Sequence, residues 1–107
     1  MSSQISFNAV TTAADGSALT EPVGYTAFID TVNPPVTSFA VPAANVTAAV
    51  AGVITVTFAA LGFVPVNDTP YFVDVTAADA DGTSAPSGVV TFTNKVVPSA
   101  PTGLKVS

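Results

Sequence analysis

The chain of 107 residues contains no cysteine, histidine, arginine or tryptophan, and two lysines supply all of its positive charge. Without cysteine it can form neither a disulfide nor a thiolate metal site. Without histidine it lacks the side chain that most often moves protons near neutral pH, and a serine or threonine nucleophile has no evident partnering base. These absences predict a protein that is not an enzyme and that uses no cofactor.

Charge of either sign is scarce. Only 8% of the residues are charged while 49% are hydrophobic, and the formal net charge is −5. Soluble domains usually have about a quarter of their residues charged. The composition fits a low-charge β-domain of the secreted type, and it fits equally a protein whose outer faces are covered by neighbours. Two lysines are too few to neutralise a phosphate backbone, so a nucleic-acid partner is not expected.

Long apolar runs are also missing. The start, MSSQISFNAV, has neither the basic end nor the apolar centre of a signal peptide, and no segment approaches the length of a membrane span. On the expectation that Met1 is the natural start, the protein is made without export through a signal sequence. Neither a membrane nor a small-molecule substrate is expected as a partner.

Apolar and polar residues alternate along much of the chain, which predicts β-strands. The expected strands are residues 5–10, 24–30, 37–41, 53–58, 71–77 and 89–94. The side chains expected to face inward are Ile5, Phe7, Ala9, Tyr25, Ala27, Ile29, Ile54, Val56, Phe58, Tyr71, Val73, Val75 and Ala77. No helix pattern competes with these strands. The Ala-rich residues 42–52 fit a wide loop, a helical turn or an additional edge strand.

The most informative segment is YFVDVTAADADGTSAPS, residues 71–87. It alternates, breaks at an Asp-Ala-Asp-Gly turn and resumes in GVVTFTN, which resembles strands F and G of a fibronectin type III domain. Upstream, ISFNAV, DGSAL and GYTAFID resemble strands B and C of bacterial members. The resemblance implies an all-β, two-sheet immunoglobulin-like sandwich over residues 1–94, with Tyr71 forming a tyrosine corner. Phe7 stands where the family commonly has a tryptophan.

The strands of this resemblance come in an unexpected order. Nothing before Ile5 resembles strand A, whereas PSAPTGLKVS at the end does, so residues 95–107 are expected to form an extended, strand-A-like tail. The linker 95–101 spans at most roughly 23–25 Å. A strand of seven residues is about 24 Å long, and the linker must also pass around the domain. Docking on a neighbouring subunit is therefore favoured over closure within one chain, with a frayed end as the alternative.

The predicted interface combines a basic, apolar tail with an acidic body. The tail residues expected to contact a neighbour are Lys95, Val96, Val97, Leu104, Lys105 and Val106. Asp15, Asp79 and Asp81 are expected to gather where the B–C and F–G loops meet, and their charge would complement the lysines. The run from Asp79 to Gly82 begins like a calcium-binding loop but lacks the closing glutamate, so no metal site is predicted.

The sequence thus suggests a non-enzymatic structural protein of a large assembly. The expected role is a bacteriophage virion component, such as a head decoration or tail-associated protein, assembled in the host cytoplasm. Its partners would be copies of itself and a larger capsid or tail. The alternative is a secreted binding or spacer module beside a bacterial carbohydrate-active enzyme or adhesin, in which PSAPTGLKVS begins the next domain.

Overall fold

The structure is a computed structural model that describes residues 3–19, 21–95 and 98–106. It is largely β, with 39% strand and 9% helix, arranged as two open antiparallel sheets. The elements are β1 (Gln4–Asn8), β2 (Gly24–Asp30), β3 (Ser38–Ala40), α1 (Ala43–Thr47), β4 (Val53–Thr57), α2 (Phe58–Leu61), β5 (Pro70–Asp79), β6 (Gly82–Thr83) and β7 (Val90–Thr93). The six strands expected from alternation are confirmed, and their ends differ from the expected positions by no more than two residues.

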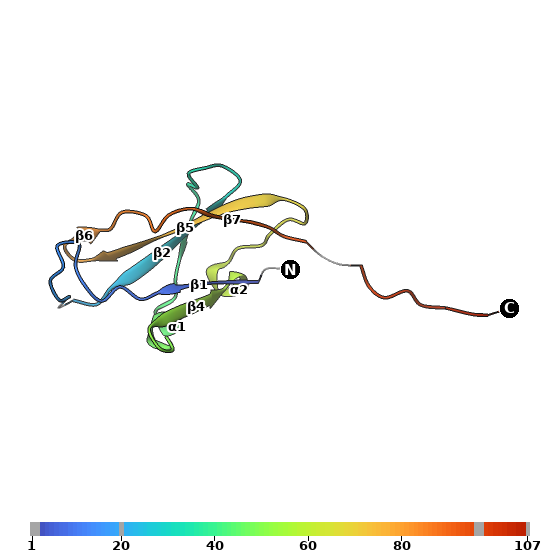
Figure 1. Ribbon diagram of the computed structural model, residues 1–107, viewed down its shortest axis with the longest axis horizontal. Helices are drawn as coiled ribbons and strands as arrows, with labels where there is room; N and C mark the ends of the chain where they lie inside the picture. The colour runs from blue at the N-terminus through green and yellow to red at the C-terminus, as the bar shows by residue number, and fades with distance from the viewer. Residues whose placement is uncertain (1–2, 20, 96–97, 107) are drawn as a thin grey trace.

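The smaller sheet contains β1 and β4, with Gln4 opposite Thr57 and Asn8 opposite Val53. The larger sheet has the order β3-β2-β5, and both β6 and β7 pair with the far edge of β5 (Figure 1). β6 was not expected from the sequence. It is a two-residue strand that closes a tight turn at the end of β5.

Between β6 and β7 the chain stays beside β5 although the strand ladder is interrupted. Ser84 donates its N–H to the carbonyl of Ala77 at 2.7 Å, and its hydroxyl accepts the N–H of Ala77 at 3.0 Å. Ser87 has the same two bonds with Val75, at 2.9 and 3.2 Å. The serine hydroxyls replace main-chain carbonyls as acceptors here. This arrangement accommodates Pro86, which has no N–H to donate to a ladder.

Side chains from both sheets meet in one core. Its buried members are Tyr25, Ala27, Ile29, Val41, Ile54, Val56, Phe58, Leu61, Phe63, Tyr71, Val73 and Ala77. The inward faces expected for β2, β4 and β5 are therefore largely confirmed. Ile5, Phe7, Ala9 and Val75 are only partly buried. Phe7 still reaches the opposite sheet, where its ring centroid lies 5.2 Å from that of Tyr25.

Each of two core tyrosines accepts a hydrogen bond from a backbone N–H and so attaches another segment to this core. The Tyr71 hydroxyl accepts the N–H of Val66 at 2.8 Å, which confirms the bond expected for that residue. The Tyr25 hydroxyl accepts the N–H of Val10, also at 2.8 Å. Both rings are buried. Each hydroxyl therefore has a hydrogen-bond partner, and it also satisfies a backbone N–H in a segment that leaves the sheet.

Two short helices interrupt the strands, one in a segment that the sequence left open and one in place of an expected strand end. α1 occupies the Ala-rich segment, which is therefore a helical turn rather than a wide loop or a strand. α2 begins where the last strand residue was expected, so β4 ends at Thr57. The Thr57 hydroxyl caps α2 by accepting the N–H of Ala60 at 3.1 Å, and Gly62 ends it with φ of 81°. Phe58 remains buried despite this change.

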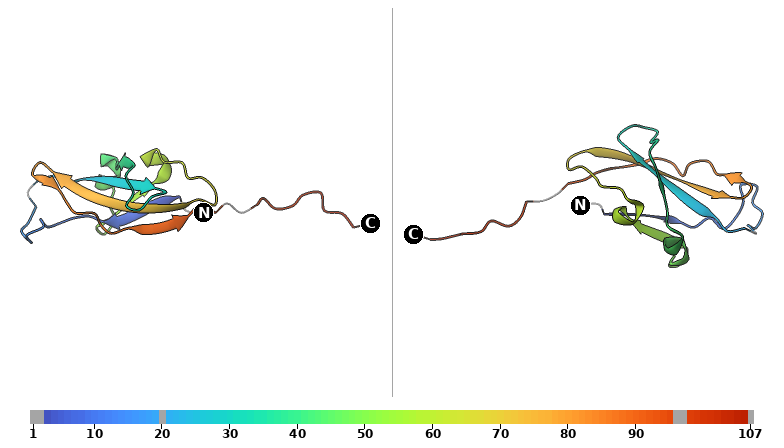
Figure 2. Two further views of the ribbon diagram at one scale, coloured as in Figure 1. Left: turned by 90° about the horizontal axis from the view of Figure 1, so that it is seen from above. Right: turned by 180° about the vertical axis from the view of Figure 1, so that it is seen from behind.

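The tail lies apart from the two sheets. Residues 98–106 form neither helix nor strand and are exposed throughout. The tail extends the molecule to 73 × 29 × 20 Å, as Figure 2 shows from two further sides. The Leu104 side chain is 92% exposed and that of Val106 99% exposed, so neither packs on the core of its own chain.

Candidate functional site

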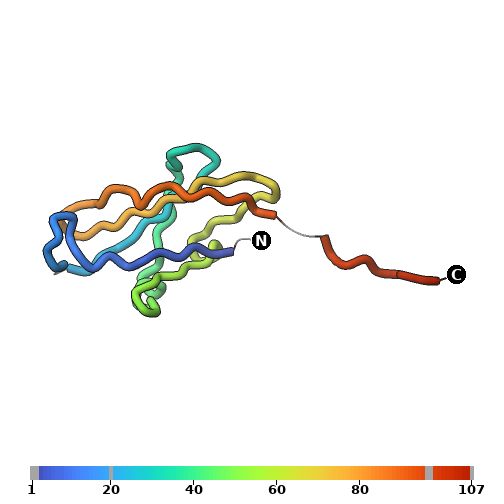
Figure 3. The backbone as a smooth tube through the Cα atoms, viewed as in Figure 1, coloured from blue at the N-terminus to red at the C-terminus, as the bar shows by residue number. Residues whose placement is uncertain are grey.

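The expected interface residues lie at opposite ends of the molecule. β1 begins and β7 ends at one end, where the tail leaves, whereas the β1–β2 loop and the β5–β6 turn lie at the other end (Figure 3). Lys95 follows β7 and is exposed, as are Leu104, Lys105 and Val106 on the tail. The other two expected tail contacts, Val96 and Val97, lie outside the described residues. A single chain therefore does not bring its lysines to its own acidic end.

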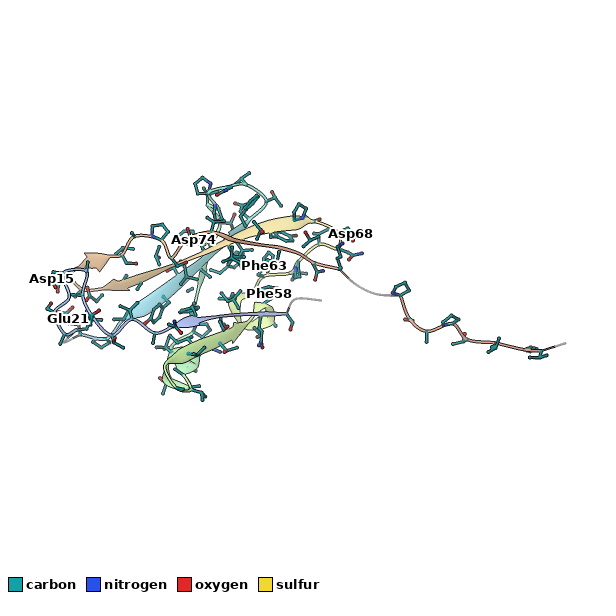
Figure 4. The ribbon with its side chains drawn as sticks, viewed as in Figure 1. Asp15, Glu21, Phe58, Phe63, Asp68 and Asp74 are labelled. Carbon is teal, nitrogen blue, oxygen red and sulfur yellow. The ribbon has the colours of Figure 1, made fainter. Side chains whose placement is uncertain are left out.

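The acidic end contains a group of three carboxylates that differs from the expected one. The carboxylate oxygens of Glu21, Asp79 and Asp81 lie within 4.8 Å of one another. Asp15 lies at the same end as Glu21 (Figure 4) but is not part of this group among the described residues. Asp15 thus lies at the end where it was expected, while Glu21 takes the third place in the close group with Asp79 and Asp81. Sequence reasoning missed Glu21 because its position depends on the path of the β1–β2 loop.

Local hydrogen bonds explain why Asp15 stays apart. Its carboxylate accepts the hydroxyl of Ser17 at 2.6 Å and the N–H of Ser17 at 3.0 Å. These bonds, the hydroxyl first, lower the pKa of Asp15. In Glu21, by contrast, the oxygen Oε2 is buried and has no hydrogen-bond partner among the described residues. The acidic end therefore has a carboxylate oxygen that lacks a donor and a concentration of negative charge suited to a cation.

A second feature is a groove of about 390 Å³ between the smaller sheet and the β5–β7 side of the larger one. Its apolar lining comes from Ile5, Phe7, Phe58, Val73, Val75, Val90 and Phe92. This opening explains why Ile5, Phe7 and Val75 are only partly buried. Their inward faces look into the groove, where no described strand covers them.

The groove runs beside a strand edge to which the described residues offer no partner. Among the described residues β1 pairs only with β4. Phe58 donates its N–H to the carbonyl of Ser3 at 2.9 Å, and Ala9 donates to Gly52 at 2.7 Å, both in the β1–β4 register. Hydrogen-bonded pairs alternate in an antiparallel ladder. Ile5 and Phe7 therefore direct their main-chain groups to β4.

It follows that the main-chain N–H and C=O groups of Gln4, Ser6 and Asn8 point toward the open edge of β1. The far edge of β4 is protected in a different way. α1 packs along it, and the Asn45 side chain donates from Nδ2 to the carbonyl of Thr55 at 3.1 Å. Sheets commonly cover their edges because unpaired strands attract other chains. The smaller sheet is thus covered on one side and ready for pairing on the other.

Asp74 shapes one wall of the groove. Its side chain is 6% exposed, and Oδ1 accepts the Ser87 hydroxyl at 3.0 Å, the Gly88 N–H at 3.2 Å and the Val75 N–H at 2.9 Å. Bonds of this kind offset the cost of burying a carboxylate. They tie the segment between β6 and β7 to β5, so Asp74 has a structural task rather than a chemical one. No local pattern in the sequence indicates this role.

Comparisons with protein-family models, with curated proteins and with solved structures returned no match. No helix among the described residues is long and apolar enough to cross a membrane.

Proposed function

We propose that this chain is a non-enzymatic structural component of a large assembly, in which the tail of each subunit binds its neighbour. One observation carries the proposal: the part of the chain that the structure describes has both an exposed apolar tail and an unpaired strand edge beside an apolar groove. Each feature alone is unfavourable in water, and each supplies what the other lacks.

The proposal includes an immunoglobulin-like fold of the fibronectin type III kind. In that scheme β1 and β4 correspond to strands B and E, and β3, β2, β5 and β7 to C′, C, F and G. The observed orders β1-β4 and β3-β2-β5-β7 support it. The Tyr71 hydroxyl bond supports it further. The place left open beside β1 is then that of strand A.

Burial of the tail gives the assembly its driving force. Fully burying a leucine or valine side chain contributes roughly 1.5–3 kcal/mol. Leu104 and Val106 are almost completely exposed, so nearly all of that contribution is still to be gained. Only 8% of all residues are charged, so few charges oppose packing against other subunits.

Within this class the proposed setting is a bacteriophage virion, where the chain would serve as a head decoration or tail-associated protein and bind a larger capsid or tail. A small β-domain with little charge and an adhesive tail suits repeated surface binding. The alternative is an extracellular spacer or binding module in which residues 98–107 begin a following domain. The departure of the tail at the end opposite the acidic cluster (Figure 4) favours that alternative, since modules in series are joined end to end.

The test is the native mass of the full chain, measured by light scattering during size-exclusion chromatography. We expect species heavier than the 10.6 kDa monomer and a return to monomer in the variant Leu104→Ser/Val106→Ser. The control is Val64→Ser, which changes a valine that is 83% exposed outside the tail and should leave the mass unchanged. A native protein that is monomeric at every concentration would contradict the proposal. The virion setting is tested by mass spectrometry of purified bacteriophage particles, in which this chain should be detected.

A further inference from the structure

We propose that the groove beside β1 receives the tail of a second copy of this chain, which adds residues 102–106 as a strand antiparallel to β1. This inference rests on the proposed function and specifies its contact. The open edge supplies the hydrogen-bonding groups, the groove supplies the apolar surface, and the tail supplies a segment that matches both. Extended segments bind sheet edges in this way, with main-chain bonds giving affinity and alternate side chains giving specificity.

The tail has the required length and alternation. Residues 102–106 are five residues long, as is β1. In an extended conformation Thr102, Leu104 and Val106 share one face, while Gly103 and Lys105 share the other. The first face meets the groove with two apolar side chains. The second face leaves the charged Lys105 in solvent.

The alternation of β1 selects a register. Ile5 and Phe7 point their side chains toward the groove, so the apolar tail residues must stand opposite them. Placing Leu104 opposite Phe7 puts Val106 opposite Ile5, and both tail side chains then cover partly buried core residues. A shift by one residue would direct Lys105 into the groove instead.

In this register the polar groups also match. Gly103 stands opposite Asn8 and Lys105 opposite Ser6, and these are the β1 residues whose main-chain groups point to the open edge. Neither Gly103 nor Lys105 is a proline, so each has an N–H to donate as well as a carbonyl to accept. The same register thus satisfies the apolar face and the ladder.

The pairing has a natural end on both strands. Pro101 would stand opposite Val10, and proline has no N–H. The N–H of Val10 is already donated to the Tyr25 hydroxyl at 2.8 Å. The ladder therefore stops at the same point for reasons that belong independently to the tail and to the acceptor.

The direction of the incoming strand agrees with the charges. A strand antiparallel to β1 enters where β1 ends, which is the acidic end of the acceptor (Figures 1 and 4). Lys95 precedes residue 102 by a linker that spans up to roughly 23–25 Å. Its ammonium can therefore reach the carboxylates of Glu21, Asp79 and Asp81, where the buried oxygen of Glu21 has no donor from the described residues.

The same geometry disfavours the tail's own groove as the docking site. β7 ends, and the tail leaves, at the end where β1 begins. To enter antiparallel to β1, a tail would have to return along the whole molecule before residue 102. A second copy placed beyond the acidic end needs no such return, which identifies the partner as another copy of this chain.

Disulfide trapping tests the contact, because the full chain has no cysteine of its own. The variants Ser6→Cys and Lys105→Cys are prepared separately and mixed in a glutathione redox buffer. Hydrogen-bonded antiparallel pairs have Cα atoms about 5.5 Å apart, within the range of about 4.4–6.8 Å for disulfides. We expect a mixed dimer of the two variants as the main disulfide product.

The matched control replaces Ser6→Cys by Thr55→Cys. Thr55 lies opposite Ser6 in the β1–β4 ladder and is also exposed, but it is one strand farther from the groove, about 4.8 Å. We expect at least tenfold less mixed dimer from Thr55→Cys with Lys105→Cys. All three substitutions are at exposed positions, so each variant should fold.

The outcomes separate this inference from the proposed function. Equal yields with the two partners, or no mixed dimer, overturn the groove contact if the native mass still shows assembly. A monomeric native mass overturns the proposed function itself. An intrachain disulfide in a monomeric Ser6→Cys/Lys105→Cys double variant would place the tail in its own groove and overturn the docking of a second copy.

Discussion

The hydroxyl of Tyr71 accepts the N–H of Val66 at 2.8 Å, and this bond joins β5 to the segment that crosses from the smaller sheet. The ring is 6% exposed, with the ring of Phe63 at 5.1 Å edge-on and that of Phe92 stacked at 5.4 Å. Tyr71 therefore combines a core contact with a backbone anchor at the start of the longest strand.

Tyr71→Phe should keep the ring packing and remove only the anchor. We expect the free energy of unfolding to fall by about 1 kcal/mol, the usual net value of such a bond. Urea denaturation followed by far-UV circular dichroism measures it. Tyr25→Phe, which loses the equivalent bond to Val10, should behave alike. A loss near zero at both positions would show that water replaces these anchors without cost.

Phe7→Ala should destabilise the isolated chain less than removal of a fully buried aromatic, which costs about 3–5 kcal/mol. Phe7 is only partly buried because one side of it faces the groove. Ile54→Ala is the comparison, since Ile54 is 0% exposed and should cost the full range of about 2–5 kcal/mol. Denaturation midpoints of monomeric samples measure both. A Phe7→Ala loss larger than that of Ile54→Ala would mean that the groove is closed in solution.

Asp74→Ala should destabilise the chain by about 1–3 kcal/mol, because it leaves the Ser87 hydroxyl and the Gly88 N–H without their acceptor. The control is Asp81→Ala, an exposed aspartate in the turn after β5, which should change stability by less than about 0.5 kcal/mol. Thermal unfolding of the two variants measures the difference. Equal effects would contradict the role of Asp74 in holding the groove wall.

Acid should weaken the fold through Asp30. The Thr37 hydroxyl, followed by the N–H groups of Thr31, Val36 and Thr37, lowers the pKa of Asp30 below its usual value of 3.8. Since the folded pKa is the lower one, the stabilisation is complete above the unfolded pKa and is lost as pH falls through the folded pKa. The Tm advantage of the native chain over Asp30→Asn should therefore shrink below about pH 4.

Tm values between pH 2 and 6 measure this advantage, and Thr37→Val provides a second check. That variant removes the largest cause of the shift, so the acid transition should move to higher pH. A Tm difference between native and Asp30→Asn chains that stays constant over the whole range would rule out this linkage.

The strands could be predicted because their periodicity is local. Tyr25, Ala27 and Ile29 recur at every second position of residues 24–30, and β2 has these bounds. The start of α2 could not be predicted in the same way, because Phe58 continues the alternation of Ile54 and Val56. Only the Thr57 cap and Gly62 mark the helix, and a threonine suits a strand equally well.

The candidate site was predictable only in part. The tail and the missing partner of β1 could be expected from the order of the strand-like segments. The participation of Glu21 in the acidic group depends on how a loop folds back, which no local pattern encodes. The groove wall depends on Asp74, whose bonds to Ser87 and Gly88 join residues far apart in sequence. Long-range contacts of this kind appear only once the sheets are assembled.

The tail and the entry to the groove lie at opposite ends, which determines how many free ends a series of joined copies retains. In the proposed assembly each copy offers one tail and one groove, so a linear series of any length would retain one free tail and one empty groove. Only a closed ring leaves neither, and a contact whose rotation does not close produces a filament. A peptide with the sequence of residues 98–106 would fill the last groove and stop growth at that end. Its dose would then set the mean length of the series.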